Sequence, residues 1–225
     1  MWSEPVDQYC ERVSPAFWAE PVNAVTNLAF LLAALAAFLL WRRDGNRDWP
    51  VLALIVVVML IGLGSFAFHT LATRGARLLD VVPIGIFIYG YLTLALRRFL
   101  GMPWTALILV LLAFIALTQL LASAVPREFL NGSSGYFPAL AALIVVGALT
   151  HDRAIRTGMF AAAATFIASL AFRIVDLDIC AAVPTGTHFL WHVLNAMVLY
   201  ILLRTAVAAA SGRQHPLRGN ASVSR

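Results

Sequence analysis

The chain has 225 residues, of which 61% are hydrophobic and only 12% are charged. A soluble globular domain carries about 25% charged residues, so this composition excludes a fully water-facing surface and indicates an integral membrane protein. All 16 basic residues are arginine, and the formal net charge is +5. In a membrane protein this excess indicates orientation in the bilayer rather than nucleic-acid binding.

Seven apolar runs approach the roughly 20 residues that one membrane crossing requires, so we predict an all-α bundle of seven transmembrane helices. The runs cover residues 21–41, 50–71, 78–96, 103–123, 136–150, 155–173 and 186–208. Their short connections predict one membrane domain over residues 1–225. Residues 1–20 are expected outside the membrane, and residues 211–225 are expected to form a polar, disordered tail. The first twenty residues lack the apolar core of a signal peptide, so the first helix is expected to direct insertion.

The arginines are unevenly distributed between the two ends of these helices. If the N-terminus lies outside, eleven arginines fall on the cytoplasmic side and five on the outer side. The eleven are Arg42, Arg43, Arg47, Arg97, Arg98, Arg153, Arg156, Arg204, Arg213, Arg218 and Arg225, and the five are Arg12, Arg74, Arg77, Arg127 and Arg173. Because basic residues favour the cytoplasmic side, this bias predicts an outer N-terminus and a cytoplasmic C-terminus.

Polar and ionisable residues gather at the predicted outer ends of three helices. Ser65 and His69 lie four residues apart, Asp80 follows after eleven more, and His188 and His192 are again four apart. Residues at this spacing share one face of a helix, and ionisable groups in membrane helices suggest function. Three imidazoles can hold zinc and leave a position for water, whose pKa the metal lowers towards about 7. We therefore predict a zinc hydrolase in which Asp80 transfers protons and Ser65 donates to an oxyanion or orients Asp80.

Each of these residues also has a structural interpretation. A membrane histidine can simply pack and form hydrogen bonds, and Ser65 fits a close helix contact. Asp80 fits a helix N-cap or a partner of Arg77. Two other classes of protein stay open: a bis-histidine haem protein, and a lipid-binding receptor or transporter in which a metal only braces the helices. His151 and His215 fall elsewhere and are not assigned to the site.

Cys10 and Cys180 both fall on the predicted outer side. A non-cytoplasmic compartment permits a disulfide, which would hold the N-terminal segment over the last helix, close to the histidine pair. Two unpaired thiols are the alternative, because a pair of cysteines fixes no geometry by itself.

These motifs together resemble the alkaline ceramidase family. The matching strings are GSFAFH with an aspartate eleven residues after its histidine, HFLWH near the C-terminus, and YCERVSPAFWAEPVNAVTNL near the N-terminus. The resemblance runs from Asp7 to about Tyr200. The family belongs to a wider group of seven-helix membrane hydrolases that includes the progestin and adiponectin receptors.

The resemblance implies a zinc-dependent amidase that splits ceramide-like N-acyl lipids into a sphingoid base and a fatty acid. By position, His69, His188 and His192 would hold zinc, and Ser65 and Asp80 would be catalytic. Cys10 and Cys180 match the disulfide of the family.

The resemblance also implies a calcium site in the N-terminal segment, as in animal members of the family. The residues that fit it are Asp7, Tyr9 through its carbonyl, Glu11 and Glu20. The chain departs from the family here, because Gln8 stands where the family has an aspartate and the stretch between the glutamates is two residues shorter. Oxygen ligands suit Ca²⁺, whereas the alternative is a salt bridge from Arg12 to either glutamate.

The expected partner is a membrane lipid, ceramide or a related N-acyl lipid, with neither nucleic acid nor an obligatory protein partner. The lipid is expected to reach the site sideways from the outer leaflet. Phe66, Phe68, Phe87 and Trp191 are candidates to line its cavity, with core packing as the alternative. The alanine- and arginine-rich composition without lysine suggests a bacterial source, hence a multi-pass protein of the inner membrane with its site towards the periplasm.

Overall fold

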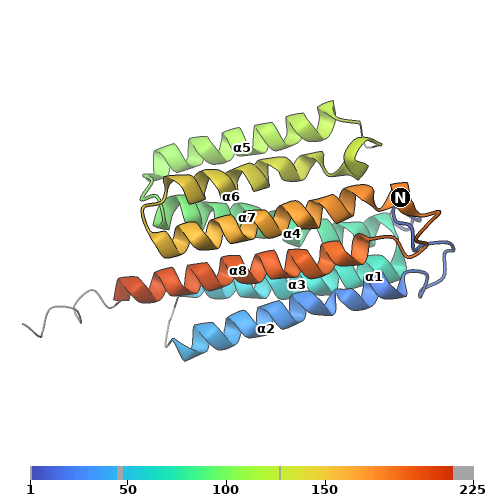
Figure 1. Ribbon diagram of the computed structural model, residues 1–225, viewed down its shortest axis with the longest axis horizontal. Helices are drawn as coiled ribbons and strands as arrows, with labels where there is room; N and C mark the ends of the chain where they lie inside the picture. Colours follow the sequence, from blue (N-terminus) through green and yellow to red (C-terminus); the bar gives the residue numbers. More distant parts are fainter. Residues whose placement is uncertain (1, 45–47, 127, 215–225) are drawn as a thin grey trace, which may run out of the picture.

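The computed structural model describes residues 2–44, 48–126 and 128–214, which form a bundle of roughly parallel and antiparallel helices (Figure 1). The α-helices are α1 (Pro21–Thr26), α2 (Leu28–Arg43), α3 (Trp49–Leu71), α4 (Arg74–Arg98), α5 (Trp104–Ala124), α6 (Phe137–Leu149), α7 (Arg153–Val175) and α8 (His188–Gln214). Three short 3₁₀ helices are η1 (Phe129–Gly132), η2 (Ser134–Tyr136) and η3 (Leu177–Ile179). The predicted all-α class is confirmed for the described residues.

Among the described residues, six helical stretches are long and apolar enough to cross a membrane. They are Pro21–Arg43, Trp49–Leu71, Arg74–Arg98, Trp104–Ala124, Arg153–Val175 and His188–Ala210. A seventh apolar stretch, Ser134–Leu149, is shorter. The chain is therefore a multi-pass membrane protein, whereas the seventh crossing and the orientation stay predictions.

Two predicted helix boundaries are wrong, and each error has a local cause. The third helix begins at Arg74 rather than residue 78, because the Thr73 side chain accepts a hydrogen bond from the Ala76 N–H and caps it. Asp80 therefore lies inside α4 and is not its N-cap. At the other end of the chain, α8 continues through residues 211–214, so the tail expected to be disordered does not begin at residue 211. Residues 215–225, with His215, lie outside the described residues.

Close packing of α3 against α4 depends on a small residue. A Cβ atom added to Gly64 would lie 1.9 Å from the Leu79 carbonyl oxygen, so only glycine allows the two backbones to approach here. Small residues at such contacts are typical of membrane helices. The contact sets the positions of the next residue on α3, Ser65, and of the residue after Leu79 on α4, Asp80.

The N-terminal segment, the link between α3 and α4 and the start of α8 lie at the same end of the bundle (Figure 1). Backbone hydrogen bonds join the first two of these, from Val6 N to Ala72 O and from Gly75 N to Trp2 O. At the opposite end, Arg98 on α4 forms an ion pair with Asp48 before α3. The predicted site residues all belong to the end covered by the N-terminal segment.

Candidate metal centre

Three buried histidines meet where α3 ends and α8 begins. His69 lies in the last turn of α3, whereas His188 and His192 lie in the first two turns of α8. One ligand atom from each ring lies within 4.8 Å of the other two. Two buried ring nitrogens, His69 Nε2 and His188 Nδ1, have no hydrogen-bond partner among the described residues. Unpaired buried nitrogens around one point are the donor set that a metal ion satisfies, so these residues fit a metal.

The Nδ1 atoms of two of these rings, His69 and His192, are held by hydrogen bonds. His69 Nδ1 lies 2.5 Å from Glu20 Oε2, and His192 Nδ1 lies 3.0 Å from the Thr26 hydroxyl. The Thr26 hydroxyl lies 2.8 Å from the Val22 carbonyl and donates its one hydrogen within its own helix turn. It must therefore accept from His192 Nδ1–H, as the Glu20 carboxylate accepts from His69 Nδ1–H. Both bonds leave Nε2 as the bare nitrogen that faces the common point.

Arg12 connects the N-terminal segment to this arrangement. Its side chain is buried and forms an ion pair with Glu20, and Nη2 donates to the backbone carbonyl of His69 at 3.0 Å. Nη1 donates to the Ser14 carbonyl at 3.1 Å. Burial alone would raise the pKa of Glu20, but the hydrogen bond from His69 and the Arg12 guanidinium hold it below its ordinary value. The predicted alternative, a salt bridge from Arg12 to a glutamate, is confirmed.

The remaining residues expected at a calcium site have other contacts. The Glu11 carboxylate accepts the backbone N–H groups of Val22 at 2.6 Å and Asn23 at 2.8 Å, at the start of α1. Burial raises the pKa of Glu11, although these two hydrogen bonds oppose the effect. Asp7 lines the cavity described below. Calcium binding therefore stays a prediction, with both glutamates already held by protein donors.

Tyr9 contacts the centre through its ring, a role that the sequence did not indicate. The ring stacks on His188 with centroids 3.6 Å apart, and its hydroxyl accepts from Arg173 Nη1 at 3.1 Å. Burial raises the pKa of Tyr9 to about 12. The Arg173 guanidinium also lies over the rings of Tyr136 and Trp191. The role of Arg173 had one signal in the sequence, an arginine at the end of an apolar helix in the string AFRIV.

Asp176 fixes the start of α8, and sequence reasoning missed it. Its Oδ1 accepts the backbone N–H of Thr187 at 2.7 Å and of His188 at 2.8 Å, and its Oδ2 accepts that of Cys10 at 3.2 Å. Gly186 has φ +61°, and a Cβ there would lie 2.2 Å from Asp176 Oδ1. A buried aspartate thus caps the helix that carries two of the histidines.

The disulfide between Cys10 and Cys180 is present, with Cα atoms 5.2 Å apart. The predicted pairing is confirmed. Because it joins residues 170 positions apart, the bridge fastens the N-terminal segment over the start of α8. Tyr9, the neighbour of Cys10, is thereby held against His188.

Ser65 and Asp80 face each other across the α3–α4 contact. Ser65 lies one turn before His69 and is hydrogen-bonded to the Asp80 side chain. Both residues line a polar cavity of about 830 Å³, together with His188 and His192. The structure therefore brings all five residues predicted for the hydrolytic site to one place.

The four aromatic residues expected around a lipid divide into two pairs. Trp191 lines the polar cavity, and Phe87 lines a second, apolar cavity. Phe66 is instead partly exposed beside Trp18, and Phe68 packs in a small cluster with Tyr9 and Ala76. These last two line neither cavity.

Comparison with protein-family models identifies the family to which the chain belongs. No curated protein matches this chain. A protein-family model described as Ceramidase matches residues 6–220, which include the three histidines, both cysteines and the Ser65–Asp80 pair. Because that match spans nearly all of a chain with this buried histidine cluster, the chain belongs to the ceramidase family, whose members are hydrolases acting on the amide bond of ceramide.

Proposed function

We propose that the chain is a zinc-dependent amidase within the membrane, which hydrolyses ceramide-like N-acyl lipids to a sphingoid base and a fatty acid. One observation carries this proposal: three buried imidazoles converge, and Glu20 and Thr26 hold the Nδ1 atoms of two of them. Three neutral nitrogen ligands with an adjacent cavity are typical of catalytic zinc sites, whereas structural zinc sites are closed by a fourth protein ligand.

Zinc bound by these histidines would supply a Lewis acid and a water activated near neutral pH. Asp80 faces the cavity and is the base that accepts a proton from the attacking water. Water adds to the amide carbon, the C–N bond breaks, and Asp80 returns the proton to the departing nitrogen to release an amine and a fatty acid. Ser65 donates its hydroxyl hydrogen to the Asp80 carboxylate and so keeps that carboxylate oriented.

The orientation with an outer N-terminus belongs to the same proposal. The disulfide lies at the end of the bundle that holds the histidines, and disulfides persist in oxidising compartments such as the periplasm. The arginines Arg42, Arg43, Arg97 and Arg98 close helices at the opposite end. Both observations support an orientation in which the site opens away from the cytoplasm, which in the proposed bacterial inner-membrane protein is the periplasmic side.

For calcium, we propose a weak or empty site. Arg12 already supplies a positive charge beside Glu20, and the two oxygens of Glu11 are occupied by backbone donors. Ca²⁺ takes about six to eight oxygen ligands, and the carboxylate oxygens of these two glutamates already accept hydrogen bonds from protein donors.

The deciding experiment measures bound metal in purified protein and fatty-acid release from ceramides and other N-acyl lipids, with and without a chelator. The proposal predicts one zinc per chain and release that stops on chelation and returns with added zinc. Lipid binding without release would favour a receptor or transporter with a structural metal. A Soret band would favour a haem protein.

A further inference from the structure

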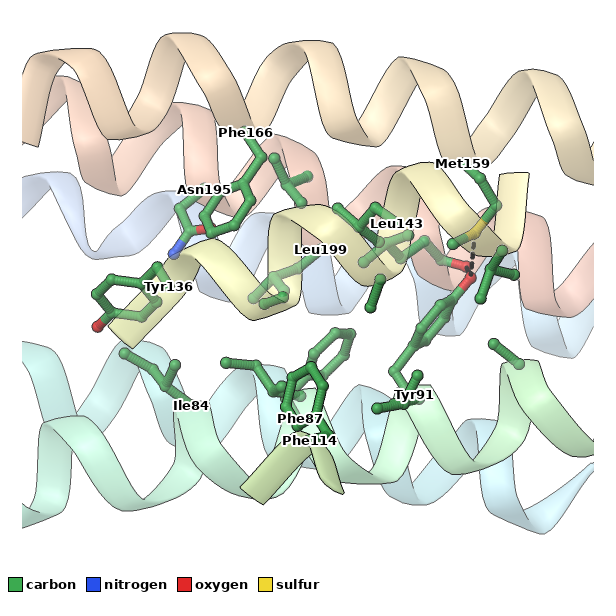
Figure 2. Close-up of a pocket in the computed structure, with 18 of the residues that line it drawn as sticks. Ile84, Phe87, Tyr91, Phe114, Tyr136, Leu143, Met159, Phe166, Asn195 and Leu199 are labelled. Atoms are coloured by element: carbon green, nitrogen blue, oxygen red, sulfur yellow. Dashed lines mark hydrogen bonds between the residues drawn. The ribbon is translucent and has the colours of Figure 1, made fainter. Parts of the chain in front are cut away.

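A second cavity lies deeper in the bundle, next to the polar cavity. Its wall is almost entirely apolar and is built from helices α3 to α8 (Figure 2). The two cavities share the wall residues Ile84, Ile88, Phe114, Tyr136 and Ala139. The deeper cavity is narrow, about 70 Å³, against about 830 Å³ for the polar one. A narrow apolar continuation of a polar site suits one hydrocarbon chain.

The deeper cavity has a polar mouth and a closed end. Tyr136 and Asn195 lie at one end, and Tyr91 and Met159 lie at the other (Figure 2). The Tyr91 hydroxyl donates to the Leu202 carbonyl at 3.0 Å and lies 3.9 Å from Met159 Sδ. This hydrogen bond holds the Tyr91 side chain across the far end of the cavity, which it closes.

The length of the path from the metal centre to the closed end of the deeper cavity follows from α8, which runs along it. His192 lies at the metal centre and Leu202 at the closed end, and a rise of 1.5 Å per residue separates them by about 15 Å. An extended chain advances about 1.2 Å per bond, since an extended residue of three bonds spans about 3.5 Å. The path thus accommodates about twelve carbons.

The two halves of an N-acyl lipid differ in polarity, which decides their placement. The amine half carries hydroxyl groups, and the polar cavity offers Arg77, Gln119 and Asn131 to them. The acyl half is a plain hydrocarbon chain and matches the apolar wall.

Given the amidase proposed above, we propose that the deeper cavity binds the acyl chain and that Tyr91 limits its length to about twelve carbons. Tyr91 is then a specificity-determining residue, far from the reacting atoms. The test measures kcat/KM for ceramides that differ only in a saturated acyl chain of 6 to 18 carbons. The wild-type enzyme is expected to show a maximum near 12 carbons and a loss of at least tenfold at 18.

The Tyr91→Ala variant should move this maximum by at least two carbons towards longer chains. Its rate on the 8-carbon substrate measures how much enzyme is folded, because that chain does not reach Tyr91. Phe160→Ala is the matched control, since Phe160 follows Met159 but is 41% exposed on the outer surface of α7, and its length profile should equal that of the wild type. A flat wild-type profile, or an unchanged maximum in Tyr91→Ala, overturns the proposal.

A binding measurement separates this proposal from the amidase itself. A ceramide carrying a photoreactive diazirine at carbon 12 of the acyl chain should crosslink to Tyr91, Met159 or Leu202, whether or not the lipid is hydrolysed. Crosslinks confined to exposed residues such as Phe160 would overturn the acyl site even in an active enzyme. Crosslinks at the closed end without fatty-acid release would support the acyl-binding site and refute the amidase activity.

A second observation concerns the mouth of the same cavity. Asn195 is 6% exposed and lines the otherwise apolar cavity at its mouth (Figure 2). It follows His192 by three residues, about 4.5 Å along the helix. A ligand hydroxyl that forms a hydrogen bond with this amide is expected to bind more tightly than a hydrocarbon chain that cannot.

We infer that Asn195 binds a hydroxyl group on carbon 2 or 3 of the acyl chain. The wild-type enzyme should hydrolyse 2- or 3-hydroxyacyl ceramide at least fivefold better, by kcat/KM, than the unsubstituted analogue of equal length. Asn195→Leu should remove that preference while retaining activity on the unsubstituted chain, which reports folding. Equal kcat/KM values for the three substrates in the wild type, or a preference that persists in Asn195→Leu, would refute the assignment.

Discussion

Glu20 and His69 form a direct hydrogen bond, with 2.5 Å between Oε2 and Nδ1, although 49 residues separate them in the chain. Glu20 immediately precedes the first membrane stretch, and His69 lies in the last turn of the second. The bond fixes which nitrogen of His69 faces the centre, and Arg12 balances the charge of Glu20. A carboxylate behind a metal-binding histidine also raises its strength as a ligand.

Replacing Glu20 should therefore weaken metal binding. Glu20→Ala is expected to lower zinc affinity by about 10- to 100-fold, because His69 loses the acceptor that orients its ring. Glu20→Gln should lose less, since an amide oxygen can still accept from Nδ1–H. Zinc affinity is measured by competition with a coloured chelator. Asp178→Asn, an exposed carboxylate in η3, is the control, and an affinity in Glu20→Ala equal to that of the control would exclude this role.

Replacing the metal ligand and replacing the base should have different effects on zinc binding and on activity. His69→Ala is expected to lose zinc and activity together. Asp80→Asn should keep zinc but lower kcat by about 10²- to 10⁴-fold, because the amide cannot accept the proton of the attacking water. Elemental analysis and fatty-acid release on the same preparations test both variants. Wild-type activity in Asp80→Asn would remove it as the base.

Much of this site could be predicted from the sequence, because its parts lie at helical spacing. The pairs Ser65 and His69, and His188 and His192, show one shared face in the sequence alone. The partners Glu20 and Thr26 could not be assigned in the same way, since their contacts depend on how α1 packs beside α3 and α8. For Glu20 the sequence left two interpretations open, a calcium ligand and a salt bridge with Arg12, and the structure shows the salt bridge.

The fold was predictable to a similar depth. Apolar length located every long helix, but it could not locate the Thr73 cap, which depends on one side-chain hydrogen bond. Asp176 and Arg173 were missed because a single charged residue near a helix end usually faces water. Here the disulfide and the Tyr9 ring cover both of them.

Removing the Arg12 side chain should destabilise the protein. Arg12→Ala leaves the Glu20 carboxylate buried without its cation, which costs about 3–5 kcal/mol. The midpoint of thermal unfolding should fall accordingly, and Arg74→Ala, which removes an exposed ion pair with Glu4, should change it little.

Activity of the wild type should survive removal of calcium with a calcium-selective chelator. Loss of activity under that treatment would show that Arg12 does not replace the ion.

Cysteine labelling in intact cells tests the orientation. Val13→Cys, at an 87% exposed position in the N-terminal segment, should react with a membrane-impermeant maleimide from outside. Arg43→Cys, at the opposite end of the bundle, should react only after the membrane is permeabilised. The reverse pattern would place the histidines at the cytoplasmic face.

X-ray absorption at the zinc edge of the purified, active protein addresses the centre most directly. It should show one zinc per chain with three imidazole nitrogens at about 2.0–2.1 Å, plus a light-atom ligand from solvent. The signal should disappear in His69→Ala and remain in Asp80→Asn. A zinc signal that survives in His69→Ala, or active protein without bound metal, would contradict a centre built from His69, His188 and His192.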